Sequence, residues 1–176
     1  MPRLREEKMG LAVWTGTILP LLRKRRVSVN EIRKAIMFKR IDHVEIVTDQ
    51  PERTERFYTD VLGFTVKLRD RIGRSGLGVP IDLVYLDLGG TVVELISYEG
   101  ASVDRAPQNE HLGYRMIALE VDDMQKATGY LKTKGVEVVW GPRVRETYSR
   151  AEICDPNGYH VELRQWFPRA DLASRS

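Results

Sequence analysis

The chain has 176 residues, of which 42% are hydrophobic and 30% are charged, and its formal net charge is +3. This length suits one domain with a full core, and the composition excludes an intrinsically disordered chain. The small net charge and the lack of a recognition motif argue against a nucleic-acid-binding protein. The single cysteine, Cys154, excludes an internal disulfide and a thiolate metal cluster, and it suits a cytoplasmic protein.

The first 37 residues differ from the rest of the chain. The apolar run 11–22 is shorter than the roughly 20 residues that span a bilayer, and its charged flanks are not those of a secretory signal. Ser28 followed by Glu31 three residues later predicts a short capped helix. We expect a basic, apolar N-terminal extension over 1–37, in part helical, and no membrane partner. It could pack on a partner subunit, be a loose terminus, or precede a true start at Met37.

A regular pattern begins at residue 38 and predicts one strand, one helix and three further strands. Residues 41–47 alternate like a half-buried strand, and 51–63 carry apolar residues at helical spacing with Gly63 as the stop. The three further strands are predicted at 64–70, 82–88 and 91–98. Residues 38–99 therefore form a first βαβββ module.

The same order recurs over residues 113–167. The predicted elements are a strand at 114–123, a helix at 124–135, and strands at 136–142, 148–155 and 159–166. His43 aligns with Met116 at an offset of 73 residues, and Glu94 aligns with Glu162 at an offset of 68. This internal repeat predicts an α+β fold of two paired βαβββ modules over 38–167, followed by a tail at 168–176.

Strand alternation places four side chains on the faces opposite the aliphatic ones: His43, Glu94, Met116 and Glu162. Two such modules side by side would form a cup lined by these residues. Two carboxylates at close range repel each other, so a shared proton or a cation is needed to hold them together. An imidazole and two carboxylates form a plausible ligand set for Ni, Co, Zn, Mn or Fe. Alternatively, His43 is a satisfied buried histidine, each glutamate pairs with an arginine, and Met116 packs in the core.

Other polar residues share these faces. His160, Glu162 and Arg164 lie on one side of the last predicted strand. Tyr148 and Arg150 point to the same side as Glu152, so they are candidates for lining a substrate site, with solvated edge residues as the alternative.

Five segments carry a resemblance to a known family: IDHVEIVTD, FYTDVLGF, VVELISY, YRMIALEVDD and DPNGYHVELRQW. Together they make residues 38–166 similar to the vicinal oxygen chelate superfamily, which includes glyoxalase I, methylmalonyl-CoA epimerase, extradiol dioxygenases, fosfomycin-resistance enzymes and bleomycin-binding proteins. The resemblance implies paired βαβββ modules whose mixed sheets form a U-shaped cup around a metal ion. The pattern is most similar to that of glyoxalase I-like members.

The glyoxalase-like ligand pattern of His, Glu, His and Glu falls here on His43, Glu94, Met116 and Glu162. The resemblance therefore implies a divalent ion (Ni, Zn, Co or Mn) at His43, Glu94 and Glu162, bound weakly or not at all because Met116 replaces a histidine. Extradiol and fosfomycin-type chemistry needs that second histidine and is not expected. His111, five residues before Met116, is an alternative ligand.

The resemblance further implies a metal-dependent lyase or isomerase of the lactoylglutathione lyase or epimerase type. Glu162 or Glu94 would abstract a proton next to a carbonyl of a small molecule or a thiol adduct. The alternative, motivated by Met116, is a metal-free protein of the bleomycin-resistance type that sequesters a small molecule. The modules could pair within one chain or between two chains, and we expect a homodimer.

Overall fold

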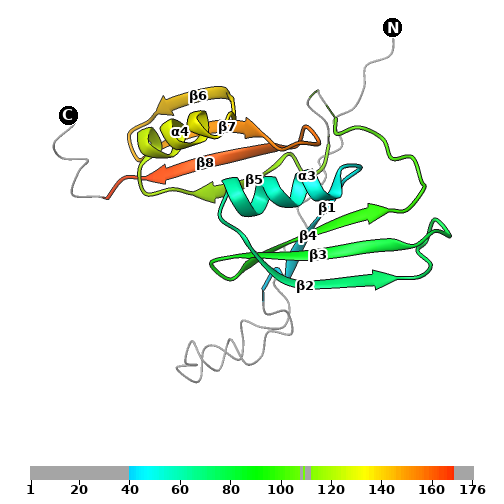
Figure 1. Ribbon diagram of the computed structural model, residues 1–176. Coiled ribbons are helices and arrows are strands. Elements are labelled where there is room, and N and C mark those ends of the chain that lie inside the picture. Colours follow the sequence, from blue (N-terminus) through cyan, green and yellow to red (C-terminus); the bar gives the residue numbers. More distant parts are fainter. Residues whose placement is uncertain (1–39, 108, 110–111, 169–176) are drawn as a thin grey trace, which may run out of the picture. The chain divides into compact units, whose positions relative to one another are not determined.

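The computed structural model describes residues 40–107, 109 and 112–168 (Figure 1). Both predicted modules belong to one compact unit, Asp42–Ser176. The predicted helix around Ser28, the alternative ligand His111 and most of the tail lie outside the described residues. Within the described part, no helix is long and apolar enough to cross a bilayer.

The first module is a four-stranded mixed sheet with a short helical segment. Its elements are β1 His43–Val47, α3 Pro51–Arg56, the π-helical turn η1 Phe57–Val61, β2 Thr65–Ile72, β3 Ile81–Leu88 and β4 Thr91–Tyr98. The strand order is β1-β4-β3-β2, with β1 parallel to β4 and the other neighbours antiparallel. The helix predicted over 51–63 is thus an α-helix that continues as a π turn.

The second module repeats this plan. Its elements are β5 Met116–Glu120, α4 Met124–Thr133, β6 Val138–Val144, β7 Tyr148–Cys154 and β8 His160–Trp166. The strand order is β5-β8-β7-β6, and β5 is parallel to β8. The side chain of Asp123 caps α4 by accepting a hydrogen bond from the backbone N–H of Lys126, and α4 packs on β6, β7 and β8 (Figure 1).

Strand register confirms the internal repeat. His43 lies opposite Val92 in the first sheet, and its repeat equivalent Met116 lies opposite His160 in the second. Two rows of cross-strand neighbours are therefore equivalent. The first row is Glu45, Glu94 and Tyr85; the second is Ala118, Glu162 and Glu152. The predicted α+β fold with two sheet modules is confirmed.

The aliphatic faces of both sheets contribute to one hydrophobic core. Val93 and Leu95 of β4 and Val161 and Leu163 of β8 are all nearly inaccessible to solvent. They alternate with the residues that carry the polar groups, because successive strand side chains point to opposite faces. Core burial on one face therefore fixes Glu94 and Glu162 on the other, since a slip of one residue would bury both glutamates in the core.

Candidate functional site

The polar face of the first sheet carries a histidine–glutamate cluster, formed by His43, Glu45, Tyr85 and Glu94. The Nε2 atom of His43 lies 3.0 Å from Oε2 of Glu94 and 3.4 Å from Oε1 of Glu45. The side chain of Glu94 is 5% exposed, whereas that of Glu45 is 60% exposed. The hydroxyl of Tyr85 donates a hydrogen bond to Glu94, and its ring lies edge-on to the imidazole of His43. A buried carboxylate is thus held between an imidazole and a phenol.

Two pKa shifts reflect the negative charge of this cluster. The hydrogen bond with Asp42 raises the pKa of His43 above its usual value, with smaller contributions from Glu45 and Glu94, while burial opposes the shift. The hydrogen bond with Glu94 raises the pKa of Tyr85 to about 12. Both shifts favour the protonated form of a group that lies beside a carboxylate.

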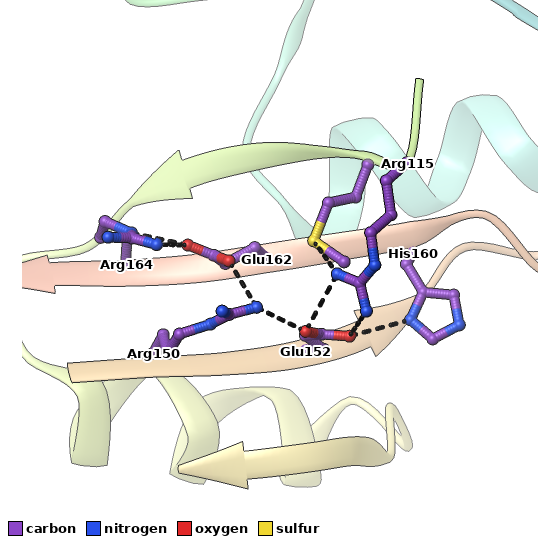
Figure 2. Close-up of polar contacts among 7 residues, drawn as sticks. Arg115, Arg150, Glu152, His160, Glu162 and Arg164 are labelled. Atoms are coloured by element: carbon purple, nitrogen blue, oxygen red, sulfur yellow. Dashed lines mark hydrogen bonds and ion pairs between the residues drawn. The ribbon is translucent and has the colours of Figure 1, made fainter. Parts of the chain in front are cut away.

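The polar face of the second sheet carries a different set of residues, the arginine cluster (Figure 2). Its members are Arg115, Arg150, Glu152, His160, Glu162 and Arg164. Nη2 of Arg150 donates to both glutamates, at 2.6 Å from Oε1 of Glu152 and 2.8 Å from Oε2 of Glu162. Arg164 holds the other oxygen of Glu162 through Nε at 2.6 Å and Nη2 at 2.5 Å. One guanidinium therefore bridges the two carboxylates.

Glu152 has three side-chain partners. Besides Arg150, it accepts hydrogen bonds from Arg115 at 3.4 and 3.5 Å, and its Oε2 lies 3.1 Å from Nδ1 of His160. Burial raises the pKa of Glu152, but the hydrogen bonds with Arg115 and His160, together with the charges of Arg115 and Arg150, outweigh burial and lower it below the usual value. The buried carboxylate therefore keeps its charge.

Aromatic rings hold two of these guanidiniums in place. Arg150 lies over Trp140 at 4.9 Å from the ring centroid, and Arg164 lies over Tyr148 at 4.4 Å and Trp166 at 5.0 Å. Gly141, next to Trp140, has a φ of +82°, and a Cβ atom there would lie 2.8 Å from the backbone oxygen of Arg150. Only a glycine allows this close approach of β6 to β7.

The structure brings the predicted site residues together in two groups. His43 and Glu94 lie in the histidine–glutamate cluster, whereas Glu162 and Arg150 lie in the arginine cluster with Tyr148 at its side. Met116 is half-buried, and its Sδ atom accepts a hydrogen bond from Arg115 at 3.2 Å. The group of residues suited to a metal ion in the described part contains Glu94 but not Glu162.

Several members of both clusters were not among the predicted site residues, although strand alternation placed most of them on the same faces. Glu45 is two residues after His43, so it shares the face of His43. Arg164 and His160 share the face of Glu162, and Glu152 shares that of Arg150. Arg115 and Tyr85 had weaker signals, because Arg115 precedes its strand and a tyrosine among aliphatic residues is typical of an ordinary core.

The donor atoms of the histidine–glutamate cluster fit a divalent metal ion. One ligand atom each from His43, Glu45 and Glu94 lies within 4.8 Å of the others. One imidazole nitrogen and two carboxylate oxygens form a set that Zn and related ions accept, and three protein ligands leave positions open for a substrate. The arginine cluster does not fit a cation, because its guanidiniums already neutralise its carboxylates.

Comparisons with known proteins identify the fold family. The family model described as "Glyoxalase/Bleomycin resistance protein/Dioxygenase superfamily" matches residues 40–163. The chain is 28% identical over 129 residues to the uncharacterized protein YaeR of Escherichia coli (strain K12), covering 71% of this chain and 95% of that protein.

Two further similarities extend to an enzyme and to a solved structure. The chain is 27% identical over 133 residues to the mitochondrial methylmalonyl-CoA epimerase of Bos taurus, covering 72% of this chain and 74% of the epimerase. The crystal structure of a glyoxalase family protein from Enterococcus faecalis is similar with a TM-score of 0.61 and 26% identity, covering 73% of this chain and 99% of that one.

Proposed function

Because the chain belongs to the Glyoxalase/Bleomycin resistance protein/Dioxygenase superfamily, we propose that it is a glyoxalase I-like, metal-dependent lyase or isomerase. It moves a proton next to a carbonyl of a small molecule or a thiol adduct. The observation that supports this most directly is the contact of 3.0 Å between His43 and the buried Glu94, with Glu45 beside them. The chemistry that a bound divalent ion supplies at such a site is polarisation of the carbonyl oxygen.

His43, Glu45 and Glu94 have distinct tasks in this proposal. Glu94 is fixed by burial and by the hydroxyl of Tyr85, so its oxygens are oriented before any ligand arrives. His43 must be neutral to bind a metal ion through Nε2. Glu45 is mostly exposed and would swing in as the third ligand. Ni, Zn, Co and Mn all accept this donor set.

Glu162 is the proposed proton-transfer residue on the second module, with Glu94 as its counterpart on the first. Both oxygens of Glu162 are engaged by guanidiniums, Oε1 by Arg164 and Oε2 by Arg150. Glu162 can therefore take a proton only after one of these contacts is broken. In this proposal the contact with Arg150 breaks first, because it is a single contact of 2.8 Å, whereas Arg164 holds Glu162 through two shorter ones.

A second candidate function is a metal-free protein that sequesters a small molecule. The engagement of Glu162 by two arginines favours it, because a carboxylate held in this way needs no ion to stabilise its charge. Met116, where the family pattern has a histidine, favours it as well, since a thioether is a poor ligand for hard divalent ions. The predicted homodimer and cytoplasmic location remain predictions under either function.

Metal titration of the full chain tests the proposal. After treatment with a chelator, we expect wild-type protein to bind about one Ni, Zn, Co or Mn ion per chain in calorimetry. His43→Ala and Glu94→Gln should each weaken binding by more than the roughly 10–100-fold caused by loss of an outer-shell partner. The matched control is Glu52→Gln, which removes an exposed carboxylate from α3 and should bind as wild type does.

Turnover is then measured by exchange of the proton next to the carbonyl with solvent deuterium. The substrates are a 2-oxoaldehyde hemithioacetal and a branched acyl thioester. We expect exchange that needs the metal ion and is lost in Glu94→Gln. In Glu162→Gln, exchange should fall while metal binding is kept. Wild-type protein that binds no divalent ion, or equal binding by His43→Ala, would overturn the enzyme and leave the sequestering protein.

A further inference from the structure

Strand β5 lies at the edge of the second sheet, where it pairs only with β8 among the described strands (Figure 1). We propose that the free edge of β5, Met116–Glu120, binds an extended peptide segment in which apolar residues alternate with lysine or arginine. The peptide would add a fifth strand to this sheet, a known mode of peptide recognition. The inference goes beyond the function proposed above, because it needs neither a metal ion nor a reaction.

The first argument is the direction of the backbone groups of β5. The N–H of Val121, directly after the strand, donates to the backbone oxygen of Arg164 in β8 at 2.8 Å. The backbone groups of alternate strand residues point to opposite sides, so Leu119 also bonds to β8, whereas Ala118 and Glu120 direct their N–H and C=O groups away from it. Both of these residues are exposed. They therefore present donors and acceptors that a further strand can pair.

The second argument is that the other three edge strands carry features that oppose pairing. Strand β2 has three basic residues and a register irregularity, and β6 has two register irregularities with Gly141 and Pro142. Strand β1 carries His43 and Glu45 of the histidine–glutamate cluster. Charges, proline and bulges are the usual protection of a sheet edge. Strand β5 has no proline and no basic residue, and Glu120 is its only charged residue.

The third argument is a cavity of about 480 Å³ that borders this edge. Consecutive residues of β5, 117–120, line it. A cavity on one face of a strand would meet alternate residues, so this cavity runs along the edge itself. Its opposite wall belongs to the first module and is mainly apolar, with Val44, Phe64, Leu88 and Val93. Walls on both sides leave room for one extended segment and not for the face of a folded subunit.

The fourth argument is the charge at the end of the edge, which defines the partner. Glu120 is exposed, and no described residue forms an ion pair or a hydrogen bond with its carboxylate. Its side chain shares a face with that of Ala118, whereas Ile117 and Leu119 point to the other face and pack against the hydrophobic core. A paired peptide follows the same alternation. Apolar residues would lie beside Ile117 and Leu119, and a lysine or an arginine would lie beside Glu120.

Hydrogen exchange of backbone amides, followed by NMR on the full chain in a chelator, tests the edge directly. In the free protein, the amides of Ala118 and Glu120 should exchange about tenfold or more faster than that of Leu119, because only Leu119 bonds to β8. The probe is a short peptide that alternates valine and lysine and has acetylated and amidated ends. At saturation, it should slow the exchange of Ala118 and Glu120 by about tenfold or more. Fluorescence anisotropy of the labelled peptide measures its affinity.

Modified peptides separate backbone pairing from side-chain contacts. One peptide carries N-methyl groups on its valines and a second carries them on its lysines, so each lacks the N–H donors of one edge. We expect one of the two to bind about tenfold or more weakly and the other to bind as the parent peptide does, because only one edge of the peptide pairs with β5. A peptide with glutamate in place of lysine should bind more weakly than the parent, because it repels Glu120.

Variants of the protein assign the binding to this edge. Ala118→Pro removes the central N–H donor, and proline is tolerated in an edge strand, so we expect binding to weaken by about tenfold or more. Glu120→Gln keeps the backbone edge and should weaken binding of the lysine peptide by about two- to fivefold, as expected for an exposed ion pair. The control Glu137→Gln removes an exposed carboxylate away from this edge and should bind as wild type does. Far-UV circular dichroism confirms that each variant is folded.

The outcomes separate this proposal from the proposed enzyme. Slower exchange of Ala118 and Glu120 with the peptide, and loss of binding in one N-methylated peptide, support the site whether or not a metal ion binds. Absence of saturable binding, or equal binding by the parent and both N-methylated peptides, would overturn it. Slow exchange of these two amides in the free protein that becomes fast on dilution would assign the edge to a second copy of the chain and overturn the peptide site.

Discussion

The two modules carry a glutamate at the same place in the same sheet, yet the surroundings of these glutamates differ. Glu94 and Glu162 occupy equivalent register positions on β4 and β8, and both are nearly fully buried. Glu94 meets an imidazole and a phenol, whereas Glu162 meets two guanidiniums. The repeated fold therefore fixes the register position and the burial of each glutamate, while the neighbouring side chains determine its hydrogen-bond and ion-pair partners.

The difference arises at the neighbouring positions of the two equivalent rows. On one side of the glutamate, Glu45 in the first row corresponds to Ala118 in the second, so the first cluster gains a carboxylate that the second lacks. On the other side, Tyr85 corresponds to Glu152, around which the second cluster gathers its arginines. One polar face thus carries donor atoms that fit a divalent cation, whereas the carboxylates of the other are already bound by guanidiniums.

Removal of Arg150 should have the largest effect on the second module. Arg150→Met keeps an aliphatic side chain of similar length against Trp140 but leaves Glu152 and Glu162 without the guanidinium that bridges them. Breaking a buried ion pair in this way leaves uncompensated charge, so we expect the free energy of unfolding to fall by about 3 kcal/mol. Urea denaturation at neutral pH measures it.

The control for this variant is a second arginine–glutamate pair near the surface. Arg69 pairs with Glu55, and their side chains are 56% and 23% exposed. Arg69→Met should cost less than about 1 kcal/mol, because exposed pairs gain little in water. Equal losses in the two variants would show that the bridge between Glu152 and Glu162 is no stronger than a surface pair.

In the first module, the hydroxyl of Tyr85 stabilises Glu94, as Arg150 stabilises Glu162 in the second module. Tyr85→Phe leaves the buried Glu94 with one donor fewer, and we expect a loss of about 1–2 kcal/mol in the free energy of unfolding. Tyr130→Phe is the control, since Tyr130 is 45% exposed and its hydroxyl lies 3.3 Å from the backbone oxygen of Asp60. A change no larger than that of Tyr130→Phe would mean that Glu94 does not depend on this hydrogen bond.

Much of the fold and part of both clusters could be predicted from the sequence. The repeat offsets gave the two modules, and alternation placed Glu94 and Glu162 on the polar faces, which the registers confirm. The repeat spacing and the strand alternation can both be read from the order of residues, so they need no knowledge of tertiary contacts. His43 beside Glu94 follows from the same reasoning, because β1 and β4 are neighbours in one sheet.

The partners of Glu162 could not be predicted in the same way. Alternation gives the side on which Arg150 and Arg164 lie, but a long flexible side chain can reach solvent, a strand neighbour or another module from the same backbone position. Pairing of each glutamate with an arginine is one interpretation of the sequence; among the described residues the structure shows it for Glu162, whereas Glu94 contacts His43. Such choices depend on packing, as the approach of Trp140 to Arg150 at Gly141 illustrates.

The smallest expected effect is on the pH dependence of stability, and it concerns Glu152. Its pKa is lowered in the folded protein, where the hydrogen bonds with Arg115 and His160 and the charges of Arg115 and Arg150 outweigh burial, so its ionised form stabilises the fold. That stabilisation is complete above the unfolded value of about 4.3 and is lost as the pH falls through the lower folded value. Wild-type protein should therefore lose more stability than Glu152→Gln between about pH 6 and pH 3, as urea midpoints would measure.

The exposed Glu137→Gln should follow the wild-type slope. A slope in Glu152→Gln as steep as in wild type would show that the arginine cluster does not stabilise the ionised form of Glu152.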